Sequence, residues 1–144
     1  MKKAWRGFCG GMLLAAIAST SVACGYCIED KIASVYDHSV VIRAMLQKHQ
    51  VVFFAIDGQL SAGEASRRTL EAIVESVIGV DKGSARVSVE AASLSAAFNP
   101  QRAPLARLER ALGRKFASRG LSIAILRVMD QPGELKSARV TGDK

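Results

Sequence analysis

The stretch VVFFAIDG at residues 51–58 indicates a buried strand, because it is a short apolar run that ends at an Asp-Gly pair. An amphipathic helix is predicted to follow, since apolar residues recur at helical spacing from Leu70 to Val77. Ser61 and Glu64 have the spacing of a capping box at the start of that helix. The sequence therefore predicts a strand followed by a helix.

The remainder of this region continues the pattern. Residues 86–90 alternate with period two, and residues 94–98 are long enough to return antiparallel as a hairpin. Pro104 opens a second predicted helix, and residues 121–128 supply a final apolar strand. The inner face of the second helix carries Leu105, Leu108, Leu112 and Phe116. We predict an α+β fold for residues 51–130, a ferredoxin-like βαββαβ sandwich with an antiparallel sheet and both helices on one face.

Residues 24–50 are predicted to form a helical segment that precedes the sandwich. Residues 28–36 place apolar side chains on one side of a helix and charged ones on the other. Residues 40–50 combine β-branched residues with good helix formers, so a strand and a helix are both open, and we favour the helix. Residues 131–144 read as a polar C-terminal tail that is loosely ordered.

The first 23 residues have the features of a secretory signal peptide. A basic start, with Lys2, Lys3 and Arg6, is followed by a short apolar run and by small residues that end at Ala23. This pattern predicts cleavage before Cys24 and a periplasmic or secreted mature protein. Lipidation of Cys24, and hence attachment to a membrane, is the alternative, although a lipoprotein signal usually has Leu three positions earlier, where this chain has Ser.

The string CGYC at residues 24–27 carries most of the chemical information. Cleavage would remove Cys9 and leave Cys24 and Cys27 as a pair. A disulfide across so short a loop stabilises a fold little, so redox exchange or soft-metal binding explains the spacing better than a structural bridge. The motif resembles the active site of thioredoxin-like disulfide isomerases over these four residues, but no strand leads into it.

The helix expected after the motif would favour thiolate forms of these cysteines and lower their pKa. His38 is a further candidate metal ligand. Along an unbroken helix it would lie about 16 Å from Cys27, so ligation would need a chain reversal at residues 37–39.

Residues 51–128 resemble the heavy-metal-associated (HMA-like) domain of metal chaperones and metal-pumping ATPases. The resemblance rests on Gly58 after the first strand, the apolar spacing of the first helix, the pair Gly79-Val80, and the end of the third strand at residues 98–100. It implies a metal-binding CxxC at the start of the first helix. The corresponding positions here are Gly63 and Ser66, so the family's ligands are missing from their usual place.

Composition narrows the range of functions. The chain of 144 residues has two His and 6% aromatic residues, which offers little material for a histidine-based catalytic site or a base-stacking platform. Three of its 20 basic residues lie in the expected signal, so the mature chain keeps a modest excess over its 13 acidic residues. We therefore expect no nucleic-acid partner, and a non-enzymatic role is favoured over catalysis.

Three functions fit these observations. The first is an exported protein that binds or transfers a soft metal ion, Cu(I) or Hg(II), through Cys24 and Cys27, with a metal-handling envelope protein as partner. The second is a thiol-disulfide redox partner in which Cys24 attacks and Cys27 resolves. The third is a non-catalytic interaction module whose cysteines are incidental.

Overall fold

The computed structural model describes residues 27–130 and 136–137, so the predicted signal peptide lies outside the described residues. The helices of this part are α1 (Ile28–Ala33), α2 (His38–Leu46), α3 (Glu64–Glu75) and α4 (Leu105–Ala117). Its strands are β1 (Gln50–Asp57), β2 (Arg86–Ser88), β3 (Ser93–Phe98), β4 (Ser122–Met129) and β5 (Lys136–Ser137). None of the described helices is long and apolar enough to cross a membrane.

The described strands form one antiparallel sheet in the order β2-β3-β1-β4-β5. In this sheet β1 lies between β3 and β4, with Val52 opposite Ala96 on one side and Val128 on the other. The predicted α+β class and the βαββαβ order from β1 to β4 are confirmed. Lys136–Ser137, within the segment expected to be a loose tail, adds a short strand at the β4 edge.

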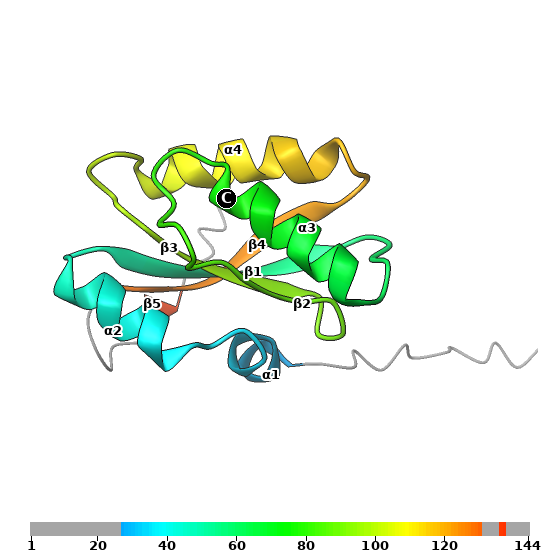
Figure 1. Cartoon of the computed structure of the whole chain (residues 1–144), viewed down its shortest axis with the longest axis horizontal. Helices are drawn as coiled ribbons and strands as arrows, with labels where there is room; N and C mark the ends of the chain where they lie inside the picture. Colours follow the sequence, from blue (N-terminus) through cyan, green and yellow to red (C-terminus); the bar gives the residue numbers. More distant parts are fainter. Residues whose placement is uncertain (1–26, 131–135, 138–144) are drawn as a thin grey trace, which may run out of the picture.

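One face of the sheet is covered by α3 and α4, which lie side by side above it (Figure 1). Alternate residues of β1, among them Val52 and Phe54, point into this core and are fully buried. The helices contribute Leu70 and Val74 from α3 and Leu108, Leu112 and Phe116 from α4. The apolar spacing that predicted these two helices therefore marks their inner faces.

The opposite face of the sheet is covered by α1 and α2, which makes the fold three layers deep (Figure 1). Val51 and Phe53, the other alternate residues of β1, point into this second core with Met129 of β4. This core also receives Ile32 of α1, Val35 of the turn that follows, and Val40, Val41 and Ala44 of α2. We call α1 and α2 with the turn between them the N-terminal layer.

The helices observed within residues 24–50 differ from the predicted ones in their bounds and in the exposure of two side chains. The favoured helix for residues 40–50 is confirmed, but it begins at His38 and ends at Leu46. The helix expected over residues 28–36 ends at Ala33, and Ile28 and Tyr36 are half-exposed although they were assigned to its apolar side. The chain turns at residues 34–37 to direct α2 along the sheet.

Polar contacts fix the N-terminal layer on strand β3. Ser95 Oγ donates to the carbonyl of Val35 at 2.7 Å, and the hydroxyls of Ser34 and Ser93 lie 2.9 Å apart. Lys31 Nζ donates to the carbonyl of Ala91 at 2.8 Å. Since Ser93 and Ser95 are buried, these bonds satisfy groups that would otherwise destabilise the interface.

Asp37 caps α2 and joins it to the sheet. Its Oδ1 accepts hydrogen bonds from the backbone N–H of Ser39 at 2.9 Å and of Val40 at 3.2 Å. Its Oδ2 lies 2.8 Å from a guanidinium nitrogen of Arg86 in β2. The hydrogen bond from the side chain of Ser39 is the main reason that the pKa of Asp37 lies well below its usual range, and Val40 and Arg86 lower it further.

The predicted capping box at the start of α3 is wrong. Gly63 is the N-cap residue, and its φ of +105° is a conformation in which an L side chain is strained. Glu64 forms ion pairs with Arg67 and Arg68 in place of a cap, and these arginines lower its pKa to about 2.

Two acids of α3, Glu71 and Glu75, are only partly exposed. Glu71 Oε1 accepts a hydrogen bond from the backbone N–H of Val87, and Glu75 Oε1 accepts one from Ala85, both at 3.3 Å. These carboxylates therefore tie α3 to the edge strand β2 and the residue before it.

Candidate functional site

Cys27 lies at the N-terminus of α1, where it is the N-cap residue. Its carbonyl accepts the backbone N–H of Lys31 at 3.0 Å, but its side chain makes no capping bond. The side chain is exposed, and its thiol forms no disulfide within the described residues. Since α1 is fixed to β3, this sulfur has a defined place at one end of the N-terminal layer.

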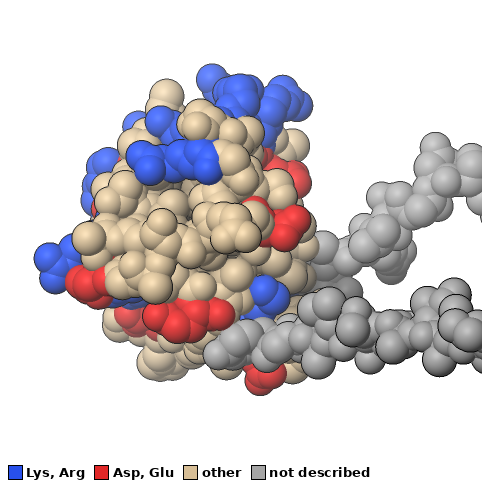
Figure 2. Space-filling view, turned by 90° about the vertical axis from the view of Figure 1, so that its right-hand side faces the viewer, with Lys and Arg blue, Asp and Glu red and all other residues tan. Residues whose placement is uncertain are grey.

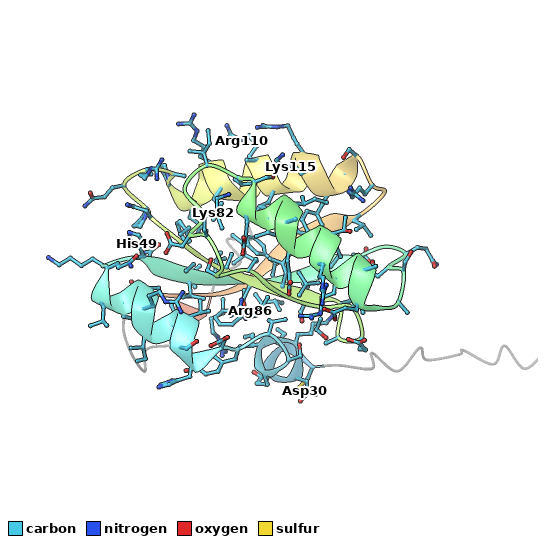
Figure 3. The ribbon with its side chains drawn as sticks, in the orientation of Figure 1. Asp30, His49, Lys82, Arg86, Arg110 and Lys115 are labelled. Carbon is cyan, nitrogen blue, oxygen red and sulfur yellow. The ribbon has the colours of Figure 1, made fainter. Side chains whose placement is uncertain are left out.

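The thiol of Cys27 is hydrogen-bonded to an acid in the same turn. Cys27 Sγ donates to Asp30 Oδ2 at 3.1 Å, and Asp30 lies on the side of α1 away from the sheet (Figure 3). This bond raises the pKa of the Cys27 thiol, and the negative charge of Asp30 and a weaker interaction with Glu29 act in the same direction. The expectation that the pKa of this thiol is lowered is wrong, because the hydrogen bond to the Asp30 carboxylate outweighs the backbone N–H of Asp30, which acts in the opposite direction.

The first cysteine of the predicted pair, Cys24, lies outside the described residues. The approach of the two sulfurs is therefore a prediction that rests on their sequence spacing. The structure describes the second cysteine of the motif, Cys27, whose accessible sulfur lies beside the carboxylate of Asp30.

His38 is exposed at the first turn of α2, and its Nδ1 lies 3.3 Å from the hydroxyl of Tyr36. α1 ends at Ala33 and the chain turns at residues 34–37, so His38 does not lie on the same helix as Cys27. In the part of the chain that the structure describes, no three His, Cys, Asp or Glu side chains form a cluster that could hold a metal. Ligation by His38 stays a prediction.

The second histidine has a structural partner. His49 Nδ1 lies 2.7 Å from Asp81 Oδ2, and both side chains are partly buried. This contact joins the start of β1 to the turn before β2.

The loop between β1 and α3, where the resemblance would place metal ligands, holds no sulfur. It borders a hollow of about 370 Å³ whose lining is polar and hydroxyl-rich. The lining consists of Gln59, Leu60, Ser61, Ala65, Ser66, Thr69, Leu70, Arg119 and Leu121. Neither thiol nor imidazole is among these groups, so a soft metal ion has no suitable ligand there.

Comparisons with known proteins give similarity at the level of solved structures. No family model matches the chain, and no curated protein matches it. One similar structure is a copper binding domain from HMA7, a P-type ATPase, with 19% identity and a TM-score of 0.43, covering 54% of this chain and 93% of that one.

Two further structures have a comparable similarity. Oxidized MerP from Ralstonia metallidurans CH34 has 21% identity and a TM-score of 0.42, covering 54% of this chain and 96% of that one. The N-terminal domain of a potential copper-translocating P-type ATPase from Bacillus subtilis, in the Cu(I)-loaded state, has 20% identity and a TM-score of 0.44. This superposition covers 58% of this chain and 94% of that domain.

Proposed function

We propose that this protein binds a soft metal ion, Cu(I) or Hg(II), through the sulfurs of Cys24 and Cys27 and passes it to a metal-handling partner outside the cytoplasm. The observation that carries the proposal is the exposed thiol of Cys27 at the N-terminus of a helix fixed to the sheet. Thiolate sulfur is a soft ligand that prefers these ions to hard ones such as Mg²⁺. Two sulfurs leave coordination positions open for the ligands of a partner, which suits transfer better than storage.

The anchoring of α1 supports a defined metal site. Ser34 holds the helix on β3 and Lys31 holds it on the turn before β3, both within two turns of Cys27, so the sulfur moves with the folded sheet. Asp30 supplies an acceptor for the thiol proton that a metal ion must displace. Because the pKa of Cys27 is raised, metal affinity is expected to increase with pH across the neutral and mildly alkaline range.

The test is titration of the anaerobically reduced full chain with Cu(I) in the presence of a competing chelator. We expect wild type to retain the ion and Cys27→Ser to lose it. Cys9→Ser is the matched control, since it removes a thiol from the predicted signal and should retain the ion. Equal retention by wild type and Cys27→Ser, or no retention by either, would refute metal binding by this pair.

A second candidate, thiol-disulfide exchange, is favoured by the contact between Cys27 and Asp30. In this scheme the Cys24 thiolate attacks a partner disulfide, forms a mixed disulfide and releases the first partner thiol. The Cys27 thiol then gives its proton to Asp30, and its sulfur attacks Cys24 and displaces the second partner thiolate. The cysteine pair is thereby oxidised to a disulfide while the partner disulfide is reduced. Reduction of a test disulfide by a chain that retains no Cu(I) would favour this function.

A further inference from the structure

The outer side of α4 and its flanks carries a concentration of positive charge. Figure 2 shows Lys and Arg side chains gathered over the top of the molecule, the level at which α4 lies in Figure 1. Within residues 102–119 the only acid is Glu109. The basic residues, all exposed, are Arg102, Arg107, Arg110, Arg114, Lys115 and Arg119, and we call them the basic face.

The charges of the basic face are not neutralised inside the described part of the chain. The neighbouring helix α3 pairs its two arginines, Arg67 and Arg68, with Glu64 and Glu71. None of the ion pairs among residues 27–130 includes a member of the basic face. Two adjacent helices on one side of the sheet therefore differ, and only α4 presents uncompensated positive charge.

An apolar hollow opens at the edge of this face. Its volume is about 240 Å³, and it is lined by Ser76, Val77, Ile78, Arg107, Ala111, Arg114 and Lys115. Ile78, in the turn after α3, is 68% exposed, which is unusual for a large aliphatic side chain. The hollow thus combines an apolar wall with three cationic side chains, and its size suits one aliphatic side chain.

We propose that the basic face binds an acidic segment of a partner polypeptide, which places one aliphatic side chain against Ile78 in the hollow. Charge complementarity selects the acidic segment, and the apolar contact fixes its register. An anionic membrane is a poorer fit, because an interfacial helix buries its apolar face in lipid. The apolar face of α4, with Leu108, Leu112 and Phe116, is already buried against the sheet.

The test uses a fluorescent peptide in which one central leucine is flanked on each side by three acidic residues. We expect its affinity for the full chain to fall about tenfold in Arg107→Gln with Arg114→Gln, and about fivefold in Ile78→Ser. The matched control is Arg43→Gln with Lys48→Gln, which removes the same charge from α2 and the turn after it and should bind as wild type does. Replacement of the leucine in the peptide by serine should weaken binding to wild type but not further weaken binding to Ile78→Ser.

Three results would overturn the proposal. One is the absence of peptide binding at low ionic strength. The second is an equal loss of affinity in the Arg43 and Lys48 control, which would show that only net charge matters. The third is binding of vesicles with anionic phosphatidylglycerol headgroups, or of a single-stranded oligonucleotide, that resists competition by the peptide. The peptide-binding variants alter exposed side chains, and unchanged far-UV circular dichroism will show that they fold.

Discussion

Removal of the Asp37 carboxylate is expected to loosen the N-terminal layer from the sheet. Asp37→Ala removes the cap of α2, which costs about 0.5–2 kcal/mol. It also removes the partly exposed ion pair with Arg86, which contributes about 0.2–1 kcal/mol. We therefore expect Asp37→Ala to lower the free energy of unfolding by about 1–3 kcal/mol at neutral pH. Asp37→Asn can still cap and should lose only about 0.2–1 kcal/mol, the contribution of the ion pair.

The difference in unfolding free energy between wild type and Asp37→Ala is expected to depend on pH. Because the pKa of Asp37 is lower in the folded protein than in the unfolded chain, its contribution is present above the usual Asp pKa of about 4. The contribution disappears as pH falls further, when the folded protein also takes up the proton. The gap between wild type and Asp37→Ala should therefore narrow steadily below about pH 4.

Urea unfolding followed by far-UV circular dichroism, at pH 7 and at several values between about 4 and 2, measures both effects. Ser39→Ala serves as a partial control, since it removes the hydroxyl that donates to Asp37 but leaves the backbone cap. A gap between wild type and Asp37→Ala that does not change with pH would refute the assignment of this stability to the carboxylate. Equal stability of the two proteins at pH 7 would refute the cap itself.

Three other predictions concern the thiol site and the core. Cys24→Ser with Cys27→Ser should change the free energy of unfolding by less than about 0.5 kcal/mol, because the Cys27 side chain is exposed and makes no backbone cap bond; thermal unfolding checks this. Leu108→Ala should cost about 2–5 kcal/mol in the same measurement, because it opens a cavity under α4 at a fully buried position. A double cysteine variant that unfolds, beside a stable Leu108→Ala, would contradict both. Asp30→Asn should lower the pKa of Cys27, so its alkylation by iodoacetamide should reach a given rate at lower pH than in wild type; coincident pH profiles would show that Asp30 has no influence.

The sandwich was predictable because its elements carry strong local signals. The apolar run at the start of β1 and the leucine repeat of α4 each determine an element and its buried side. The turn before α3 was less predictable, since Ser61 and Glu64 have the right spacing for a capping box, but Gly63 adopts a positive φ and becomes the N-cap residue instead. The roles of Glu71 and Glu75 also depend on β2, which is distant in sequence.

The packing of the N-terminal layer was not predicted, although a signal for it exists in β1. Residues 51–54 are all apolar, so both faces of the strand need to be covered, and two helices on one face cannot do this. Strand β3 is likewise buried on both faces, and its small residues leave room for a helix. The place of Cys27 at a helix start was predictable from spacing, whereas its raised pKa depends on the side-chain conformation of Asp30.

The N-terminal layer is synthesised before the strands that it packs against. Its helices, of six and nine residues, are shorter than the roughly 12–15 residues that an isolated helix needs to be even marginally stable in water. They emerge first, but their partners are spread over β1, β3 and β4; Lys31 bonds to Ala91, sixty residues later. Such distant contacts form late, so the first of the described helices can pack only after β3 has been made. Cys27 therefore acquires its fixed place beside the sheet only after Ala91 and β3 have been synthesised.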